Sequence, residues 1–357
     1  MSGRPRSARR LGAEPAFPEA LGWRPAAFAC LAAILLLGVL LSVMVGSVPV
    51  APGEVVRALL GRGSAVDDPV VTVVRQIRLP RAILAGIVGA CLSLAGLGFQ
   101  AISRNPLADP TVLGVSSGAS FGITVAILLG FLGPFANPAV GTLFAFGGAL
   151  VAAVCVYAIA RVDGRLPITT LLLAGVIVGL FFNACVMLAT ALLASAELQG
   201  VVFWLMGNLG PTSLRSLAVL ALTLAISAGV LVRQATRLNL LALGEEQALQ
   251  LGVEAERVKR LVFVAASLVT GAAVSAAGSV GFVGLIVPHA ARLLLGPDNR
   301  RLVPATALLG AAFLMLADLV ARTVAAPTEL PVGVITAFCG APLFVYLLRT
   351  RRGGDAL

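Results

Sequence analysis

The chain has 357 residues, of which 59% are hydrophobic and only 12% are charged, and its mean hydropathy is +1.01. An ordinary soluble domain carries about 25% charged residues. This composition excludes a soluble globular protein, because too few polar side chains remain to cover a core of this size. The formal net charge of +10 could indicate nucleic-acid binding, but the basic residues gather at the ends of apolar segments, which argues against that partner. Lipid must be part of the solvent.

The N-terminal residues 1–25 are predicted to form an arginine-rich cytoplasmic tail. The apolar run 26–48 follows it and contains 23 residues without a charge. A cleavable signal has an apolar region of only about 7 to 15 residues. We therefore interpret this run as a retained first membrane span.

The sequence predicts an all-α membrane protein with about ten transmembrane helices in one membrane domain over 26–349, followed by a cytoplasmic tail over 350–357. Each span needs about 20 apolar residues, because only a closed helix satisfies its own backbone in hydrocarbon. The spans are expected at 26–48, 82–102, 112–132, 139–160, 169–193, 214–232, 261–280, 284–295, 302–325 and 332–348. The eighth is short and contains Pro288, so a broken or partial helix is expected there.

The distribution of basic residues orients these spans. With ten spans and a cytoplasmic N-terminus, nineteen of the 26 Lys and Arg residues lie at cytoplasmic ends. The positive-inside rule therefore predicts that both termini are cytoplasmic. Five of the seven outside arginines fall in one loop, between Arg57 and Arg81, where an acidic partner could dock.

Two segments of the chain share a pattern that indicates an internal repeat. Gly89-Ala-Cys-Leu-Ser-Leu-Ala-Gly96 recurs as Gly271-Ala-Ala-Val-Ser-Ala-Ala-Gly278, at an offset of 182 residues. The offset moves the second span onto the seventh, and an odd number of crossings reverses direction, so the halves would be inverted. Inverted repeats are typical of transporters, although small residues also recur simply to let helices pack closely.

Two cytoplasmic segments are candidates for a mechanical role. The polar interruption contains the stretch 238–254, predicted to include a short amphipathic helix between Gly244 and Gly252 that either docks a soluble partner or only connects two spans. The stretch Arg104-Asn-Pro-Leu-Ala-Asp-Pro110 ends the second span, because paired prolines stop a helix. It is either a tight turn or part of a gate at the inner mouth of a central path.

Few ionisable residues lie within the spans. Asp318 and Arg322 are spaced i, i+4 on one helix face, and we favour an internal ion pair over an Arg322 that faces a partner. His289 is the single histidine and could be a haem ligand or make a structural hydrogen bond. The five cysteines show no CxxC spacing and are interpreted as small core residues. No paired nucleophile and base appears, so an enzyme is not expected.

Several motifs together cover most of the chain from residue 78 onward. They are Arg78-Leu-Pro-Arg81, Asn105-Pro-Leu-Ala-Asp-Pro110 with Leu113-Gly-Val-Ser, Leu171-Leu-Leu-Ala-Gly175, Gly281-Phe-Val-Gly-Leu-Ile-Val-Pro-His289, Ala317-Asp-Leu-Val-Ala-Arg322 and Glu329-Leu-Pro331. In these stretches the sequence strongly resembles the FecCD-type permeases of ABC importers, the family that includes vitamin B12, iron-siderophore and haem permeases.

The resemblance implies a homodimer around a central path lined by the fifth and tenth spans. Two ATPase subunits, which would hold ATP and Mg, are implied below it and a periplasmic substrate-binding protein above it, and the chain itself would bind no cofactor or metal. The implied ATPase-coupling residues are Leu243, Gly244, Glu245, Glu246, Ala248, Leu251 and Gly252. The implied gate residues are Asn105, Leu107, Ile168 and Thr169, and Arg78, Arg81 and Arg322 match positions that meet the binding protein.

The function expected from the sequence is therefore the permease of an ABC importer in a bacterial inner membrane. Its cargo is expected to be a ferric chelate, either a siderophore or haem, with vitamin B12 as the alternative. An ion-coupled secondary transporter that works alone is the runner-up from another class, because an inverted repeat suits it equally. That class usually places ionisable groups in its path, and apart from Asp318 this chain offers few.

Overall fold

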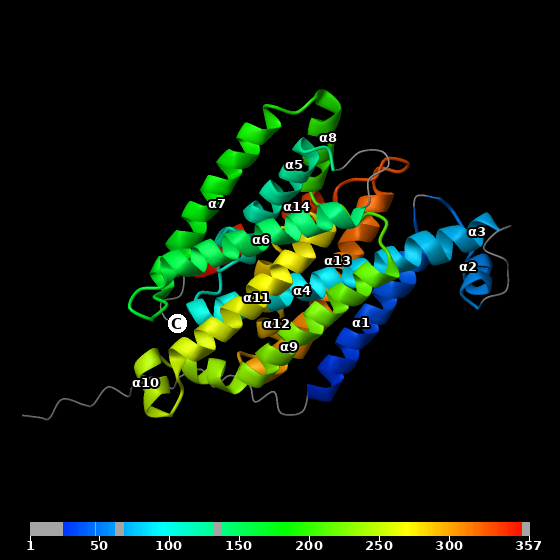
Figure 1. The fold of residues 1–357 in the computed structure, drawn as a ribbon. Helices are drawn as coiled ribbons and strands as arrows, with labels where there is room; N and C mark the ends of the chain where they lie inside the picture. Colours follow the sequence, from blue (N-terminus) through cyan, green and yellow to red (C-terminus); the bar gives the residue numbers. More distant parts are fainter. Residues whose placement is uncertain (1–23, 47, 61–67, 132–137, 352–357) are drawn as a thin grey trace, which may run out of the picture.

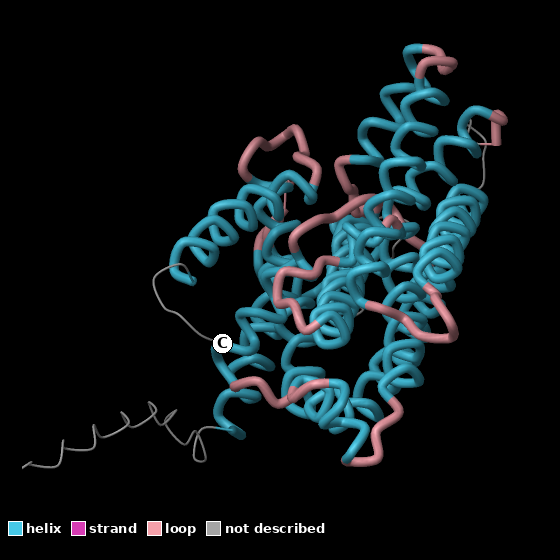
Figure 2. Tube along the Cα trace, turned by 90° about the vertical axis from the view of Figure 1, so that its left-hand side faces the viewer, coloured by secondary structure: helices cyan, strands magenta, loops and turns pink. Residues whose placement is uncertain are grey.

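The computed structural model describes residues 24–46, 48–60, 68–131 and 138–351 (Figure 1). The predicted tails lie outside these ranges, up to residue 23 at one end and from residue 352 at the other. Apart from one isolated β-bridge between Val162 and Arg165, regular structure in the described ranges is helical (Figure 2). The all-α prediction is confirmed.

A helix occupies each of the ten predicted spans. They are α1 (Arg24–Met44), α4 (Leu79–Ser103), α5 (Val115–Leu128), α6 (Pro138–Ala160), α7 (Ile168–Thr190), α9 (Leu214–Ala242), α11 (Ala255–Ala277), α12 (Val283–Leu295), α13 (Asn299–Thr323) and α14 (Val332–Arg351). Seven helices in the described part are long and apolar enough to cross a membrane, and α5, α12 and α14 have shorter apolar stretches. The eighth span is short as expected, and α12 follows Phe282, whose φ is +67°.

The loops between these helices lie on two opposite sides of the bundle. The short helix α10 (Glu245–Gln250) is at one end, and α2 (Pro52–Leu59), α3 (Pro69–Thr72) and α8 (Ser195–Leu205) are at the other (Figure 1). We call these ends the α10 side and the α2 side. Because the ten helices alternate in direction, the described ends Arg24 and Arg351 are both on the α10 side.

The structure corrects the predicted connections in three places. The described part of the arginine-rich loop is largely helical, with α2, α3 and a π-helix over Val73–Arg78 that runs directly into α4. The helix α8 lies in the connection between the fifth and sixth spans, where the sequence predicts no helix. The sixth span extends ten residues beyond its predicted end to Ala242, because the stretch 233–242 contains no Gly or Pro and its arginines can reach water from an extended helix.

The helix α4 occupies the centre of the bundle (Figure 1) and packs against α1, α9, α11, α12 and α13. Glycines allow its backbone to touch its neighbours directly. A Cβ atom on Gly89 would overlap the carbonyl oxygen of Gly310 in α13, and one on Gly96 would overlap the carbonyl oxygen of Gly284 in α12. The small residues that suggested a repeat therefore also permit close packing, as both interpretations allowed.

The pattern of helix contacts agrees with inverted halves. The helix α4 packs on α12 and α13, and α11, five spans later, packs on α5 and α6. The contact of α5 with α7 likewise has its counterpart in the contact of α12 with α14. A shift by five helices maps these neighbours onto one another, as a structural repeat requires, whereas the contact of α1 with α13 has no comparable counterpart between α9 and α6.

The contact between α4 and α12 can be tested by adding a single methyl group. We expect Gly96→Ala to destabilise the protein by about 1–3 kcal/mol, because overpacking forces two backbones apart. Gly229→Ala in α9 is the matched control, since a Cβ there meets nothing within 4 Å. Thermal unfolding of both purified variants in detergent checks this, and equal melting temperatures would contradict it.

Candidate functional site

The segment 243–252 on the α10 side, which we call the coupling segment, forms a compact turn around α10. Gly244 and Gly252 bound it with φ values of +127° and +78°, which favour glycine at both positions. Ala248 is fully buried and fixes the inner face of α10. The side chains of Leu243, Leu249 and Leu251 are 61%, 66% and 60% exposed. The segment therefore presents an apolar surface beyond the ends of the membrane helices.

The base of the coupling segment is fixed to the start of α13. Asn239, near the end of α9, donates from Nδ2 to Asp298 Oδ1 at 2.7 Å and accepts from the Asn299 backbone N–H at 2.9 Å. Burial works to raise the pKa of Asp298, but hydrogen bonds from Asn239 and the Arg300 N–H hold that pKa below its ordinary value. The carboxylate is therefore charged at neutral pH and caps α13 through the Arg300 N–H.

The predicted proline-bounded turn ends α4 as expected. The helix stops at Ser103, Arg104 takes a left-handed φ of +49°, and Asn105 Oδ1 accepts a hydrogen bond from the Leu107 N–H at 3.0 Å. Asp109 is buried and accepts from the Thr111 N–H at 2.7 Å. Burial raises the pKa of Asp109. This turn is thus rigidly built from its own side chains.

The second pair of predicted gate residues lies at the start of α7. Ile168 is half-buried and Thr169 is exposed. Among the described residues no hydrogen bond or ion pair joins them directly to Asn105 or Leu107 at the end of α4. Both pairs are on the α10 side, so the structure is compatible with the predicted gate, which stays a prediction.

Sequence reasoning did not single out Lys259, which lies in the first turns of α11 beside the coupling segment. Its side chain is only 4% exposed, and Nζ is 2.5 Å from Glu256 Oε1 and 3.3 Å from Glu245 Oε1. It also donates to the Leu166 carbonyl oxygen at 3.0 Å. In the sequence Lys259 is one of several basic residues at span ends, and nothing in the local pattern distinguishes the buried one.

A cluster of charged residues lies on the α2 side, where α4 begins and α13 ends. Asp318 is buried and is shared by two arginines: Arg81 Nη2 is 2.9 Å from its Oδ1, and Arg322 Nε is 3.0 Å from its Oδ2. Arg81 also reaches the more exposed Glu329 at 2.6 Å. The internal ion pair of Asp318 with Arg322 is confirmed, and a carboxylate paired in this way can stay within a bilayer.

Arg78 and Arg322 are each only 3% exposed and both hold the end of α1. Arg78 Nη1 donates to the Met44 carbonyl oxygen at 2.9 Å, and Arg78 Nη2 donates to that of Val48. Arg322 Nη2 donates to the Ser42 carbonyl oxygen at 3.2 Å. These two predicted docking arginines are therefore bound internally in this structure, because buried backbone carbonyls need donors. The docking role of all three arginines stays a prediction.

The other residues that the sequence singled out either make contacts within the chain or have no role that the structure assigns. Arg57 pairs with Asp68 at 2.9 Å, and Arg75 donates to the Leu59 carbonyl oxygen, so part of the arginine excess outside is neutralised locally. His289 is half-buried within α12. In the described part of the chain no group of three or more His, Cys, Asp or Glu side chains is placed to hold a metal ion.

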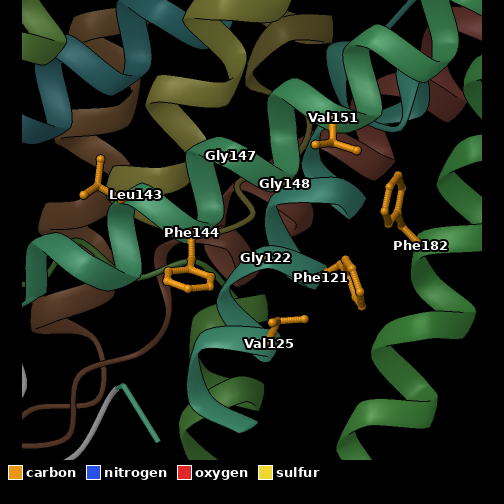
Figure 3. Close-up of a pocket in the computed structure, with 9 residues that line it drawn as sticks. All are labelled: Phe121, Gly122, Val125, Leu143, Phe144, Gly147, Gly148, Val151 and Phe182. Atoms are coloured by element: carbon orange, nitrogen blue, oxygen red, sulfur yellow. The ribbon is translucent and has the colours of Figure 1, made fainter. Parts of the chain in front are cut away.

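An open apolar groove of about 450 Å³ lies between α5, α6 and α7 (Figure 3). The rings of Phe121, Phe144 and Phe182 line it together with aliphatic side chains and the bare backbone of glycines (Figure 3). None of the residues that line it carries a polar side chain. Such a surface suits hydrocarbon and has no group that could select a polar cargo.

The helix α7 presents an apolar stripe that the rest of the chain leaves largely uncovered. Its members recur at helical spacing and are all strongly exposed: Leu173, Ile177, Leu180, Phe181 and Leu188. The helix α14 likewise exposes Phe338 and Val345. These two helices are the ones expected from the family resemblance to line a central path.

Most of the chain is similar in sequence to known permeases. The FecCD transport family matches the chain over residues 34–350. The cobalamin import system permease protein BtuC of Halobacterium salinarum is 46% identical over 293 residues, which cover 80% of this chain and 76% of that protein. The vitamin B12 import system permease protein BtuC of Escherichia coli is 39% identical over 323 residues, which cover 89% of this chain and 93% of that protein.

Two further similar proteins have less specific descriptions. The ABC transporter permease protein YvrB of Bacillus subtilis is 41% identical over 336 residues, which cover 90% of this chain and 93% of that protein. A solved structure, described as an inward-facing ABC transporter of the metal-chelate type, superposes with a TM-score of 0.77 at 31% identity and covers 91% of this chain and 99% of its own. The family resemblance is confirmed.

The charged cluster on the α2 side allows a direct test of internal pairing. We expect Asp318→Asn to cost about 3–5 kcal/mol of stability, because it leaves two arginines without their shared buried carboxylate. Glu329→Gln removes a partner of Arg81 that is more exposed, and should cost about 0–1 kcal/mol. Melting temperatures in detergent measure both, and a larger loss for Glu329→Gln would refute this account of the cluster.

Proposed function

The chain belongs to the FecCD transport family of ABC importer permeases, and we propose that it carries a metal chelate inward across the plasma membrane while separate ATPase subunits hydrolyse ATP. On this proposal the α10 side faces the cytoplasm, in agreement with the positive-inside rule. The chain contributes the path for the cargo, the gate at its cytoplasmic end and the coupling segment that contacts the ATPase. It performs no chemistry on the cargo or on ATP.

The observation that carries this proposal is the coupling segment. Three leucines are exposed on a small, firmly anchored element that lies between the ends of α9 and α11 on the α10 side. Exposed apolar side chains grouped outside a bilayer indicate a protein contact. We assign this surface to the ATPase subunit, because it occupies the position that matches the family's coupling helix.

A second copy of the chain is the proposed partner within the membrane. The apolar stripe of α7 and the exposed side chains of α14 are largely uncovered within one chain. Pairing of two copies around these helices would enclose a path between them, with Ile168 and Thr169 at its cytoplasmic mouth. A C2 pairing is the commonest arrangement for such an assembly.

Of the three predicted docking arginines, we propose Arg81 as the one that contacts the binding protein. Its side chain is the more exposed of the three predicted arginines, and it already bonds to the partly exposed carboxylate of Glu329. A carboxylate of a binding protein would meet the same guanidinium. Arg78 and Arg322 support that position by fixing the end of α1 and Asp318.

For the cargo, we place a corrinoid first and a ferric siderophore or haem second. Two of the similar permeases have names that state cobalamin or vitamin B12, which supports a corrinoid as the first choice, whereas the sequence favoured a ferric chelate. The solved relative of the metal-chelate type supports the wider class. The secondary-transporter alternative loses support, because Asp318, its main candidate for ion coupling, is engaged by two arginines.

The coupling surface can be tested by making its leucines polar. We expect Leu249→Ser with Leu251→Ser to weaken binding of the ATPase subunit at least about tenfold, because each buried leucine contributes about 1.5–3 kcal/mol. Val56→Ser, at an exposed apolar position on the α2 side, is the control. Co-purification and titration of the ATPase subunit measure the effect, and unchanged binding of the double variant would exclude this surface.

Cargo is tested by uptake into proteoliposomes that contain the permease, its ATPase and its binding protein. We expect labelled cobalamin to accumulate with ATP, and the same assay compares ferric siderophore and haem. Uptake of a ferric siderophore alone would reverse the order of cargoes. Uptake driven by an ion gradient without any ATPase subunit would refute the importer itself.

A further inference from the structure

A buried cation, Lys259, joins the coupling segment to α11 and to the loop before α7. Lys259 Nζ makes three contacts: Glu245 on the coupling segment, Glu256 one turn earlier on α11, and the carbonyl oxygen of Leu166. These contacts satisfy the three donors of an ammonium group. A lysine this deeply buried is costly unless it is fully paired, so its position is tightly determined by all three partners.

The contact with Leu166 reaches the start of α7. Glu256 Oε2 accepts a hydrogen bond from the Leu166 N–H at 2.7 Å, while Lys259 holds the carbonyl of the same residue at 3.0 Å. The Leu166 side chain is itself buried. The backbone is therefore held on both of its polar groups, two residues before the predicted gate residue Ile168.

The same coupling-segment carboxylate also reaches the other predicted gate element. Glu245 Oε1 is 3.9 Å from Arg104 Nη2, at the turn that ends α4 and leads into Asn105. Both side chains are substantially exposed, so this second contact is weaker and more easily screened than the contact with Lys259. Glu245 is thus placed between the two elements that carry the gate residues.

We propose that Glu245 and Lys259 form a charged hub that transmits movement of the coupling segment to the start of α7, with Arg104 as a secondary arm to the end of α4. Lys259 is then a positioning residue that acts through Leu166 on the gate. The inference rests on the proposed function. An ATPase that displaces α10 would move Glu245, and the buried lysine would carry that displacement to the loop before Ile168.

The test uses the full chain, reconstituted with its ATPase subunits and binding protein, and the quantity measured is ATP hydrolysed per cargo molecule imported. Lys259→Met keeps a long side chain but removes the charge. We expect it to raise this ratio about tenfold, as a coupling free energy of ordinary size would require. Arg257→Met, an exposed cation on the same helix, is the matched control and should leave the ratio unchanged.

A double-mutant cycle separates the hub from a merely structural role. Glu245→Gln alone should raise the ratio, and adding Lys259→Met should raise it little further, because both changes break the same connection. Additive effects would show two independent roles and overturn the hub. Arg104→Gln should have a smaller effect that disappears at high ionic strength.

The outcomes distinguish this inference from the proposed function. Lack of ATP-driven import by the unmodified chain with every cargo would refute the proposed function. Normal import by the unmodified chain, together with an unchanged ratio in a folded Lys259→Met variant, would refute the hub alone. If Lys259→Met does not fold, Glu245→Gln decides: Glu245 is 39% exposed and its loss leaves Lys259 paired with Glu256, so an unchanged ratio there overturns the inference.

Discussion

Direct contact between the backbone of α4 and those of α12 and α13 is the constraint on which the rest of the structure depends. Lipid tails are as apolar as leucine, so helices in a bilayer associate through close packing and polar contacts. Gly96 and Gly89 remove the side chains that would hold α4 away from Gly284 and Gly310. The remaining helices surround this central contact, and the loops of both halves are placed by it.

Buried charges then fix the two sides of the bundle in different ways. On the α2 side, Asp318 and its arginines join α4 to α13, and Arg78 holds the end of α1. On the α10 side, Lys259 joins α11 to the coupling segment and to the loop before α7. The first cluster lies among long, closely packed helices. The second lies where the start of α11 meets the coupling segment and the loop before α7.

The sequence predicted the apolar helices and their number well, because a bilayer requires long uncharged segments and little else resembles them. It predicted the ion pair of Asp318 with Arg322, since i, i+4 spacing fixes that contact locally. It did not predict the contacts of Arg78, whose acceptors are the backbone carbonyls of Met44 and Val48. Those carbonyls become available only when the end of α1 meets the start of α4.

The buried lysine illustrates the same limit at the candidate site. A basic residue near the end of a membrane helix is usually exposed at the interface, and Arg257 beside it follows that rule. The burial of Lys259 depends on Leu166, which is 93 residues away in the sequence. The hydrophobic periodicity of a single helix cannot predict a contact between residues so far apart in the sequence. Only the packed structure distinguishes the paired cation from its exposed neighbours.

The packing of α7 explains why holding Leu166 can affect a whole path. Along its length α7 contacts α5 closely, where Gly114 lies against the backbone of Gly175 and Gly179. Sharp bends in an α-helix occur mainly at proline, at adjacent Gly or Ser pairs, or at an inserted group. Ile168–Thr190 contains no proline and no two adjacent glycines. A displacement at its first turn therefore moves it as a rod against α5. The exposed stripe of α7 would move with it, so one hydrogen-bonded peptide at the cytoplasmic end can change the shape of the path that this stripe is proposed to line.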